Sequence, residues 1–183
     1  MPDAEARSHS GAAPPMATHP WAFGALLAAL AFAGNFLHVP LFFGVDYVFG
    51  SIAALLAAVW LGPVAGMVVA AVGGLYTLEL WGHPWGLLLF ALEAGTVGLL
   101  YRRFRDLVRA DLLFWLIVGV PIILLAYKVG MGMDWHAAGL IALKQPVNGV
   151  FNALVAGGVL YLVGLGREGY DALAPIQWPV NTA

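Results

Sequence analysis

The chain has 183 residues, of which 62% are hydrophobic and 10% charged, and its formal net charge at pH 7 is −2. Soluble domains carry about 25% charged residues, so a surface this apolar is expected to face lipid. The sequence contains no cysteine, which excludes disulfides, thiolate metal sites and cysteine nucleophiles. No basic stretch is long enough to indicate a nucleic-acid partner. The composition therefore predicts an all-α integral membrane protein.

Six apolar runs, separated by Gly, Pro and charged residues, predict six transmembrane helices, because each run reaches about 17 residues, which is enough to cross a bilayer. In chain order the predicted helices are Trp21–Leu37, Val45–Leu61, Pro63–Leu80, Pro84–Tyr101, Leu112–Val129 and His136–Val163. Pro121 is expected to bend the fifth helix and Pro146 to kink or break the sixth. The six-helix domain thus covers residues 21–165. Residues 1–20 are expected to form a disordered tail, and residues 166–183 a short cytoplasmic tail.

The orientation of this bundle follows from its arginines. Four of them lie between the fourth and fifth predicted helices, at Arg102, Arg103, Arg105 and Arg109. Lys and Arg accumulate in the cytoplasmic loops of membrane proteins, so this loop is expected inside the cell. Six alternating crossings then place both termini in the cytoplasm. The predicted location is the bacterial cytoplasmic membrane, with the lipid bilayer as the principal partner.

Charged and amide side chains gather toward the outer side of the predicted bundle. Glu93 and Lys144 lie at similar depth, roughly eight or nine residues into their helices, so we expect them to meet inside the bundle, directly or through a ligand or water. Lys144, Asn148 and Asn152 recur every four residues and share one helix face, with Gln145 beside them. These residues predict an outward-facing pocket for a small ligand; the alternative is a scaffold whose amides only bond neighbouring helices. The expected ligand-binding residues are Asn35, Asp46, Glu79, Glu93, Lys144, Gln145, Asn148 and Asn152.

Three histidines near the outer side indicate a second kind of site. His38, His83 and His136 could hold a divalent metal or offer an axial ligand to haem. Asp46 or Glu79 could complete such a site. No pair of these histidines has the spacing of a ligand motif such as His-x-x-x-His. A haem- or metal-binding membrane sensor therefore stays open as an alternative.

The first predicted helix carries small residues at Ala25, Ala29 and Ala33, a spacing that lets membrane helices approach closely. This stripe predicts either packing within the bundle or docking on a partner membrane protein. A homodimer also stays open.

Motifs of common enzymes are missing from the sequence. It contains no Gly-rich phosphate loop, no Gly-x-Ser-x-Gly and no His-Glu-x-x-His. We therefore do not expect an enzyme.

Four segments of the chain carry a resemblance to a known family. They are Leu41–Ser51, Leu80–Pro84, Phe90–Ala94 and Ala142–Leu154, of which the Lys-Gln-Pro-x-Asn-Gly-x-Phe-Asn block is the most specific part. Together they resemble an N-terminal membrane domain of bacterial sensor proteins, in which it precedes a histidine kinase or diguanylate cyclase module. The resemblance implies a sensory input domain, as in two-component systems, that signals to a cytoplasmic module. Whether the domain is free-standing or belongs to such a sensor stays open.

The predicted architecture also resembles a class of transport proteins. Six helices, an outward polar pocket and an alanine stripe on the first helix are similar to the substrate-binding subunits of energy-coupling factor vitamin transporters. In that family the first helix docks on the transmembrane coupling subunit. This resemblance implies an alternative function in substrate uptake.

Overall fold

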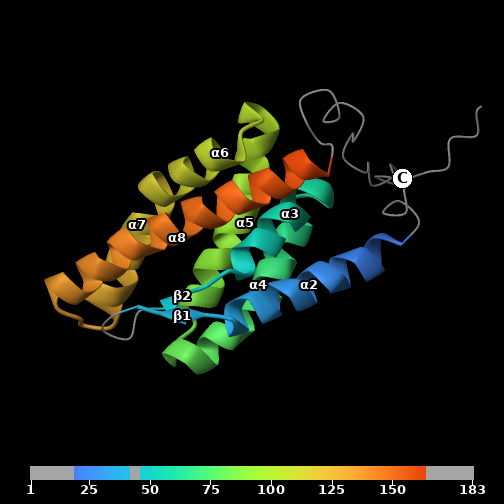
Figure 1. The fold of residues 1–183 in the computed structure, drawn as a ribbon. Helices are drawn as coiled ribbons and strands as arrows, with labels where there is room; N and C mark the ends of the chain where they lie inside the picture. Colours follow the sequence, from blue (N-terminus) through green and yellow to red (C-terminus); the bar gives the residue numbers. More distant parts are fainter. Residues whose placement is uncertain (1–18, 42–45, 164–183) are drawn as a thin grey trace, which may run out of the picture.

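The computed structural model describes residues 19–41 and 46–163. The helices are α2 (Pro20–Phe36), α3 (Gly50–Trp60), α4 (Pro63–Trp81), α5 (Trp85–Phe104), α6 (Leu107–Phe114), α7 (Val120–Ile123) and α8 (Trp135–Leu162). Two π-helical segments, η1 (Trp115–Gly119) and η2 (Leu124–Gly130), flank α7. The predicted all-α class is confirmed for this part of the chain, apart from one short pair of strands (Figure 1). The expected tails lie outside the described residues, except that Pro20 already begins α2.

The two ends of the bundle differ in chemistry. The first helix, α2, begins on the side where α8 ends (Figure 1). Arg102, near the end of α5, lies against Gly62 in the turn between α3 and α4. We call this the arginine end, because Arg102, Arg103, Arg105 and Arg109 lie at the α5–α6 turn. The opposite end, called the pocket end, contains the strand pair, the α4–α5 turn and the start of α8.

Glycine lets α4 pack closely against two neighbouring helices. A Cβ added to Gly73 would lie 2.8 Å from the Cβ of Ala31 on α2. A Cβ added to Gly66 would lie 2.5 Å from the Cβ of Ala58 on α3. Neither position has room for a side chain. Because both residues are glycines, the backbone of α4 can approach α2 and α3 closely.

The second helix is shorter than predicted. The prediction of a helix over Val45–Leu61 is wrong at its start, because α3 begins at Gly50. Before it, β2 (Asp46–Tyr47) pairs antiparallel with β1 (Val39–Pro40). A short apolar run does not by itself distinguish helix from extended chain, which explains the error. The 11 residues of α3 span only about 16 Å, roughly half of a hydrocarbon core.

The fifth helix begins earlier than predicted. The expected start was Leu112, but α6 starts at Leu107, after Asp106 accepts the backbone N–H of Arg109 at 2.9 Å. Pro121 has no N–H and its ring crowds the preceding turn, and the wide turns of η1 and η2 on either side accommodate it. The residues Leu107–Gly130 therefore form one continuous helical segment of 24 residues, and the expected bend at Pro121 stays a prediction.

The last helix runs the length of the bundle. Asp134 caps α8 by accepting the backbone N–H groups of His136 and Ala137 at 2.9 and 3.0 Å. The helix is 28 residues long and continues through Pro146, so the alternative of a break there is wrong, and the alternative of a kink stays a prediction. At about 1.5 Å per residue it is roughly 42 Å long and connects the pocket end to the arginine end.

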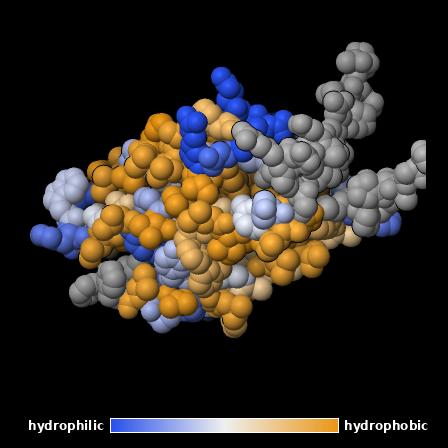
Figure 2. All heavy atoms as spheres, turned by 45° about the horizontal axis from the view of Figure 1, so that its top comes forward, coloured by the Kyte–Doolittle hydropathy of each residue, from blue (hydrophilic) through white to orange (hydrophobic). Residues whose placement is uncertain are grey.

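The surface of the described helices is strongly apolar. Two segments, Pro63–Trp81 and Leu107–Gly130, are long and apolar enough to cross a membrane by length and composition. Large hydrophobic side chains also lie exposed on the other long helices, including Leu30 (52% exposed), Leu99 (60%) and Leu143 (68%). Figure 2 shows a broad hydrophobic surface, with hydrophilic residues gathered in separate patches.

Candidate ligand-binding site

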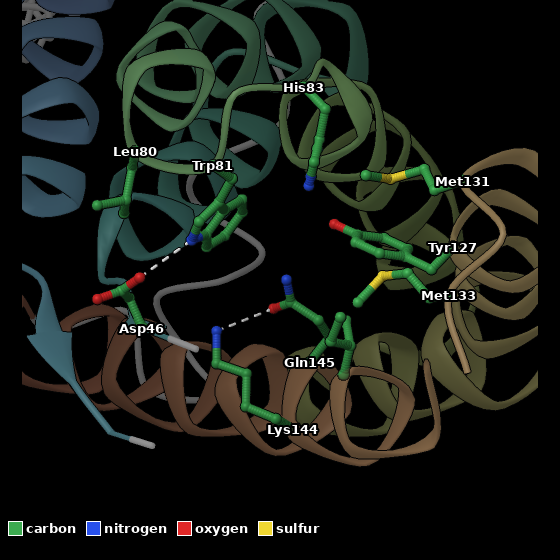
Figure 3. Close-up of a pocket in the computed structure, with 10 residues that line it drawn as sticks. Asp46, Leu80, Trp81, His83, Tyr127, Met131, Met133, Lys144 and Gln145 are labelled. Atoms are coloured by element: carbon green, nitrogen blue, oxygen red, sulfur yellow. Dashed lines mark hydrogen bonds between the residues drawn. The ribbon is translucent and has the colours of Figure 1, made fainter. Parts of the chain in front are cut away.

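A cavity of about 300 Å³ lies at the pocket end, where the α4–α5 turn, η2 and α8 come together (Figure 3). Its apolar wall is formed by Leu80, Trp81, Met131, Met133 and Ile141. Its polar groups belong to Asp46, His83, Tyr127, Lys144 and Gln145. A cavity of this volume lies at the small end of the range for ligand pockets and suits a small organic molecule.

Lys144 provides the positive charge of the cavity. Its side chain is buried, and its ammonium group donates one long hydrogen bond, 3.3 Å, to Oε1 of Gln145. The ring centroids of Trp81 and Tyr47 lie 5.5 and 5.9 Å from the same nitrogen, so both rings stabilise the cation. An ammonium group has three N–H donors. Since Gln145 is its one hydrogen-bond partner among the described residues, two donors are left for water or a ligand.

Asp46 is close to Lys144 but is held by other groups. Its Oδ2 accepts the indole N–H of Trp81 at 3.1 Å, and its Oδ1 lies 3.9 Å from Nε2 of His38. The position follows from β2, which turns Asp46 toward the cavity (Figure 3). Among the described residues no ion pair joins Asp46 directly to Lys144. The carboxylate attracts the ammonium without neutralising it by contact.

His83 and Tyr127 form the opposite wall of the cavity. Their rings meet edge to face, with centroids 5.1 Å apart and an interplanar angle of 87°. Burial lowers the pKa of His83, against the opposing effect of its backbone hydrogen bond, so the imidazole is uncharged at neutral pH. Its Nδ1 is buried and has no hydrogen-bond partner among the described residues. The imidazole and the Tyr127 hydroxyl both point into the cavity (Figure 3) and offer neutral hydrogen-bonding groups.

The three asparagines expected to bind ligand contact backbone instead. Asn148 accepts the N–H of Val48 at 3.0 Å and donates to its carbonyl at 2.7 Å, and Asn152 donates to that carbonyl at 3.0 Å. Asn35 accepts the N–H of Gly50 at 2.7 Å and donates to the carbonyl of Gly73 at 2.9 Å. Buried backbone groups need such partners. The asparagines therefore provide hydrogen-bond partners for backbone groups in and just after the irregular segment that leads into α3.

Glu93 and Lys144 do not form the expected direct pair. Glu93 accepts hydrogen bonds from Ser51 and Trp115, and it lies against Gly149 of α8. Gly149 is five residues beyond Lys144, or about 7.5 Å further along the helix axis. Depth counted along two separate helices ignores their relative shift, which explains why no direct pair forms; a contact through a ligand or water stays a prediction. Glu79, also expected in the pocket, is exposed and does not line the cavity.

The described histidines do not come together in a three-ligand metal site. His38 lies near Asp46, His83 faces Tyr127, and His136 is exposed beside Asp134 at 3.7 Å. No group of three His, Asp or Glu side chains that could hold a metal ion occurs in the part of the chain that the structure describes. A metal site shared by His38, His83 and His136 is therefore contradicted, whereas an axial haem ligand, which needs a single histidine, stays a prediction.

The alanine stripe of α2 faces outward. Ala25, Ala29 and Ala33 are all exposed, so they do not pack within the described bundle. The face of α2 that packs inward carries Leu27, Ala31 and Asn35 instead. Near the arginine end, Ala25 and neighbouring residues of α2 and α4 line an apolar groove.

Sequence analysis missed two residues that the structure places at polar sites. Tyr127 lay inside a predicted apolar helix and was not distinguished from packing residues. Asp111 fell outside the predicted helices, because the fifth helix was expected to start at Leu112. The cap at Asp106 was the available signal: a helix starting just after it carries Asp111 into the bundle.

No protein-family model, curated protein or solved structure matches the chain. Its function has to be argued from the geometry described above.

Proposed function

We propose that the chain is a multi-pass protein of the bacterial cytoplasmic membrane, with the arginine end inside and the pocket end outside. The exposed apolar side chains on every long helix support this, since monomeric soluble proteins rarely expose contiguous apolar patches beyond a few hundred Å². The clustering of arginines at one end supports the orientation. The short helix α3 is compatible with a location in the membrane. Irregular backbone within a membrane requires hydrogen-bond partners inside the protein, and asparagines bond the extended segment before α3.

Within this membrane protein, the cavity at the pocket end binds a small organic ligand that carries an anionic group. The observation that carries the proposal is the buried ammonium group of Lys144, which lies within about 6 Å of two aromatic ring centroids and has two donors that no described residue accepts. A ligand carboxylate or phosphate there would accept from Lys144 and from the amide of Gln145. Its apolar part would lie against Trp81 and the two methionines of the wall.

The protein then acts as a sensory input domain for a cytoplasmic signalling module, a kinase or cyclase. Lys144 and Gln145 lie on α8, and the same helix ends at Leu162 at the arginine end. A ligand that binds one position of α8 more tightly than another shifts the helix toward that position. The pocket and the cytoplasmic side are thus connected by one rigid element.

A second candidate function is substrate uptake as the binding subunit of an energy-coupling factor type transporter. The exposed face of Ala25, Ala29 and Ala33 favours it, since small residues allow close docking of another membrane helix. Copurification of a coupling subunit and its ATPases with the tagged chain would support uptake over sensing. Copurification should then be lost when Ala29 is replaced by a bulky residue.

The ligand proposal is tested by native mass spectrometry of the detergent-purified chain. We expect a bound small molecule on the native chain and on Lys128→Ala, and none on Lys144→Ala. Lys128 is the matched control because it is the only other lysine in the sequence and does not line the cavity; it donates to the backbone carbonyl of Met133, whose side chain does. The proposal fails if the native chain carries no adduct, or if Lys144→Ala keeps it.

A further inference from the structure

A second polar site lies deeper in the bundle than the cavity, where α5 meets α6. The carboxyl groups of Glu93 and Asp111 lie against each other there, within hydrogen-bonding reach. Glu93 is 1% exposed and Asp111 is 0% exposed, so neither group reaches solvent. Two carboxyl groups in contact, away from water, require an explanation in terms of charge.

The hydrogen-bond donors at this site are unequally divided. Oε2 of Glu93 accepts the hydroxyl of Ser51 at 2.7 Å, and Oε1 accepts the indole N–H of Trp115 at 2.9 Å. Asp111 lies near the same indole group, but neither of its buried carboxyl oxygens accepts a hydrogen bond from the described residues. An ionised carboxylate is acceptor-only, so two carboxylates cannot bond each other. A single proton between them would supply the missing bond.

No other charge at the site offsets two carboxylates. In the part of the chain that the structure describes, no ion pair links Glu93 or Asp111 to Lys, Arg or His. Among the described residues that contact the pair, none is charged: α3 contributes Ser51, η1 contributes Trp115 and α8 contributes Gly149. Two unit charges in contact at low dielectric repel strongly. The pair is therefore expected to carry one negative charge rather than two.

The backbone of α8 closes the site. A Cβ added to Gly149 would collide with Nε1 of Trp115 and would lie 2.8 Å from Oε1 of Glu93. Trp115 itself begins the π-helical segment η1, a type of widened turn that is frequent at functional sites. The pair thus contacts both η1 and the helix that carries Lys144.

We propose that Glu93 and Asp111 form a buried proton-binding site, in which the two carboxyl groups share one proton in a hydrogen bond. The proton comes from water and joins a carboxylate oxygen, which converts a pair with two negative charges into a pair with one. Loss of the proton leaves two carboxylates that repel each other and push α5 away from α6. This site is separate from the ligand cavity, and its existence does not depend on what the cavity binds.

The test is infrared spectroscopy of the detergent-purified chain, which detects the C=O stretch of a protonated carboxyl group. At neutral pH we expect such a band in the native chain, with a downshift in D2O. It should persist in Asp134→Asn, which alters an exposed carboxylate, and disappear in the double variant Glu93→Gln, Asp111→Asn. The proposal is overturned if the native chain shows no such band, or if the same band remains in the double variant. It is also overturned by a band that sodium abolishes and potassium does not, since the pair would then hold sodium.

A milder variant decides the question if the double variant does not fold. Ser51→Ala removes a donor to Glu93 and leaves both carboxyl groups in place. The band should keep its area and change its frequency, because the shared hydrogen bond then lies in an altered environment. An unmoved band would assign the proton to another carboxyl group and overturn the proposal.

Discussion

At the scale of single residues, the buried polar groups divide by what they contact. Asn35, Asn148 and Asn152 bond backbone groups of neighbouring segments, whereas Lys144 and Gln145 direct their unused donors toward a cavity. The first set holds the bundle together. The second set is available for binding.

Replacing Asn148 by Ala is expected to destabilise the protein more than replacing Asn152. Asn148→Ala leaves the N–H of Val48 without its bond, and an unsatisfied buried group costs about 1–3 kcal/mol. Asn152→Ala leaves that N–H bonded and keeps one donor on the Val48 carbonyl, so this variant should lose less stability than Asn148→Ala. Thermal unfolding in detergent, followed by tryptophan fluorescence, measures both variants. A larger loss for Asn152→Ala would contradict this role of Asn148.

The sequence predicts burial better than it predicts partners at this scale. Periodicity placed Lys144, Asn148 and Asn152 on one face, and all three are buried. It could not indicate that Val48 faces the asparagines or that Asp111 faces Glu93. Those pairs join segments on different helices, and their contact depends on how the helices shift along one another.

At the scale of elements, the errors fall where apolar composition is ambiguous. The third, fourth and sixth predicted helices begin and end close to α4, α5 and α8. The start of α3 was wrong because Asp46 and Tyr47 bond another strand, a contact that composition does not encode. The π-helical turns beside Pro121 were also beyond prediction, since a proline indicates a disturbance and not the form it takes.

A pair of glycine variants tests the close packing of α2 against α4. Gly73→Ala should lower the free energy of unfolding by about 1–3 kcal/mol, because its Cβ would lie 2.8 Å from that of Ala31. Gly139→Ala is the control: it lies on α8 with no neighbour within 4 Å, so removal of a helical glycine should leave stability unchanged or raise it by about 0.5–1 kcal/mol. Thermal unfolding in detergent measures both. Equal effects of the two variants would refute the packing argument.

At the scale of the whole molecule, an apolar side surface lies between two ends of different chemistry. The apolar surface runs around the helices, the arginines gather at one end, and the cavity opens near the other. Because α8 runs between the two ends, an orientation in the membrane would place ligand binding and signal output on opposite sides. The functional proposal therefore depends on that orientation, which is directly measurable.

The absence of cysteine from the sequence makes the orientation test simple. A single cysteine at His136, exposed at the start of α8, should react in intact cells with a maleimide that does not cross membranes. A cysteine at Arg103, exposed at the arginine end, should react only after the cells are permeabilised. The unsubstituted chain controls for background labelling. Labelling of Arg103→Cys in intact cells would contradict the proposed orientation. The arginine end would then face outward, away from a cytoplasmic signalling module.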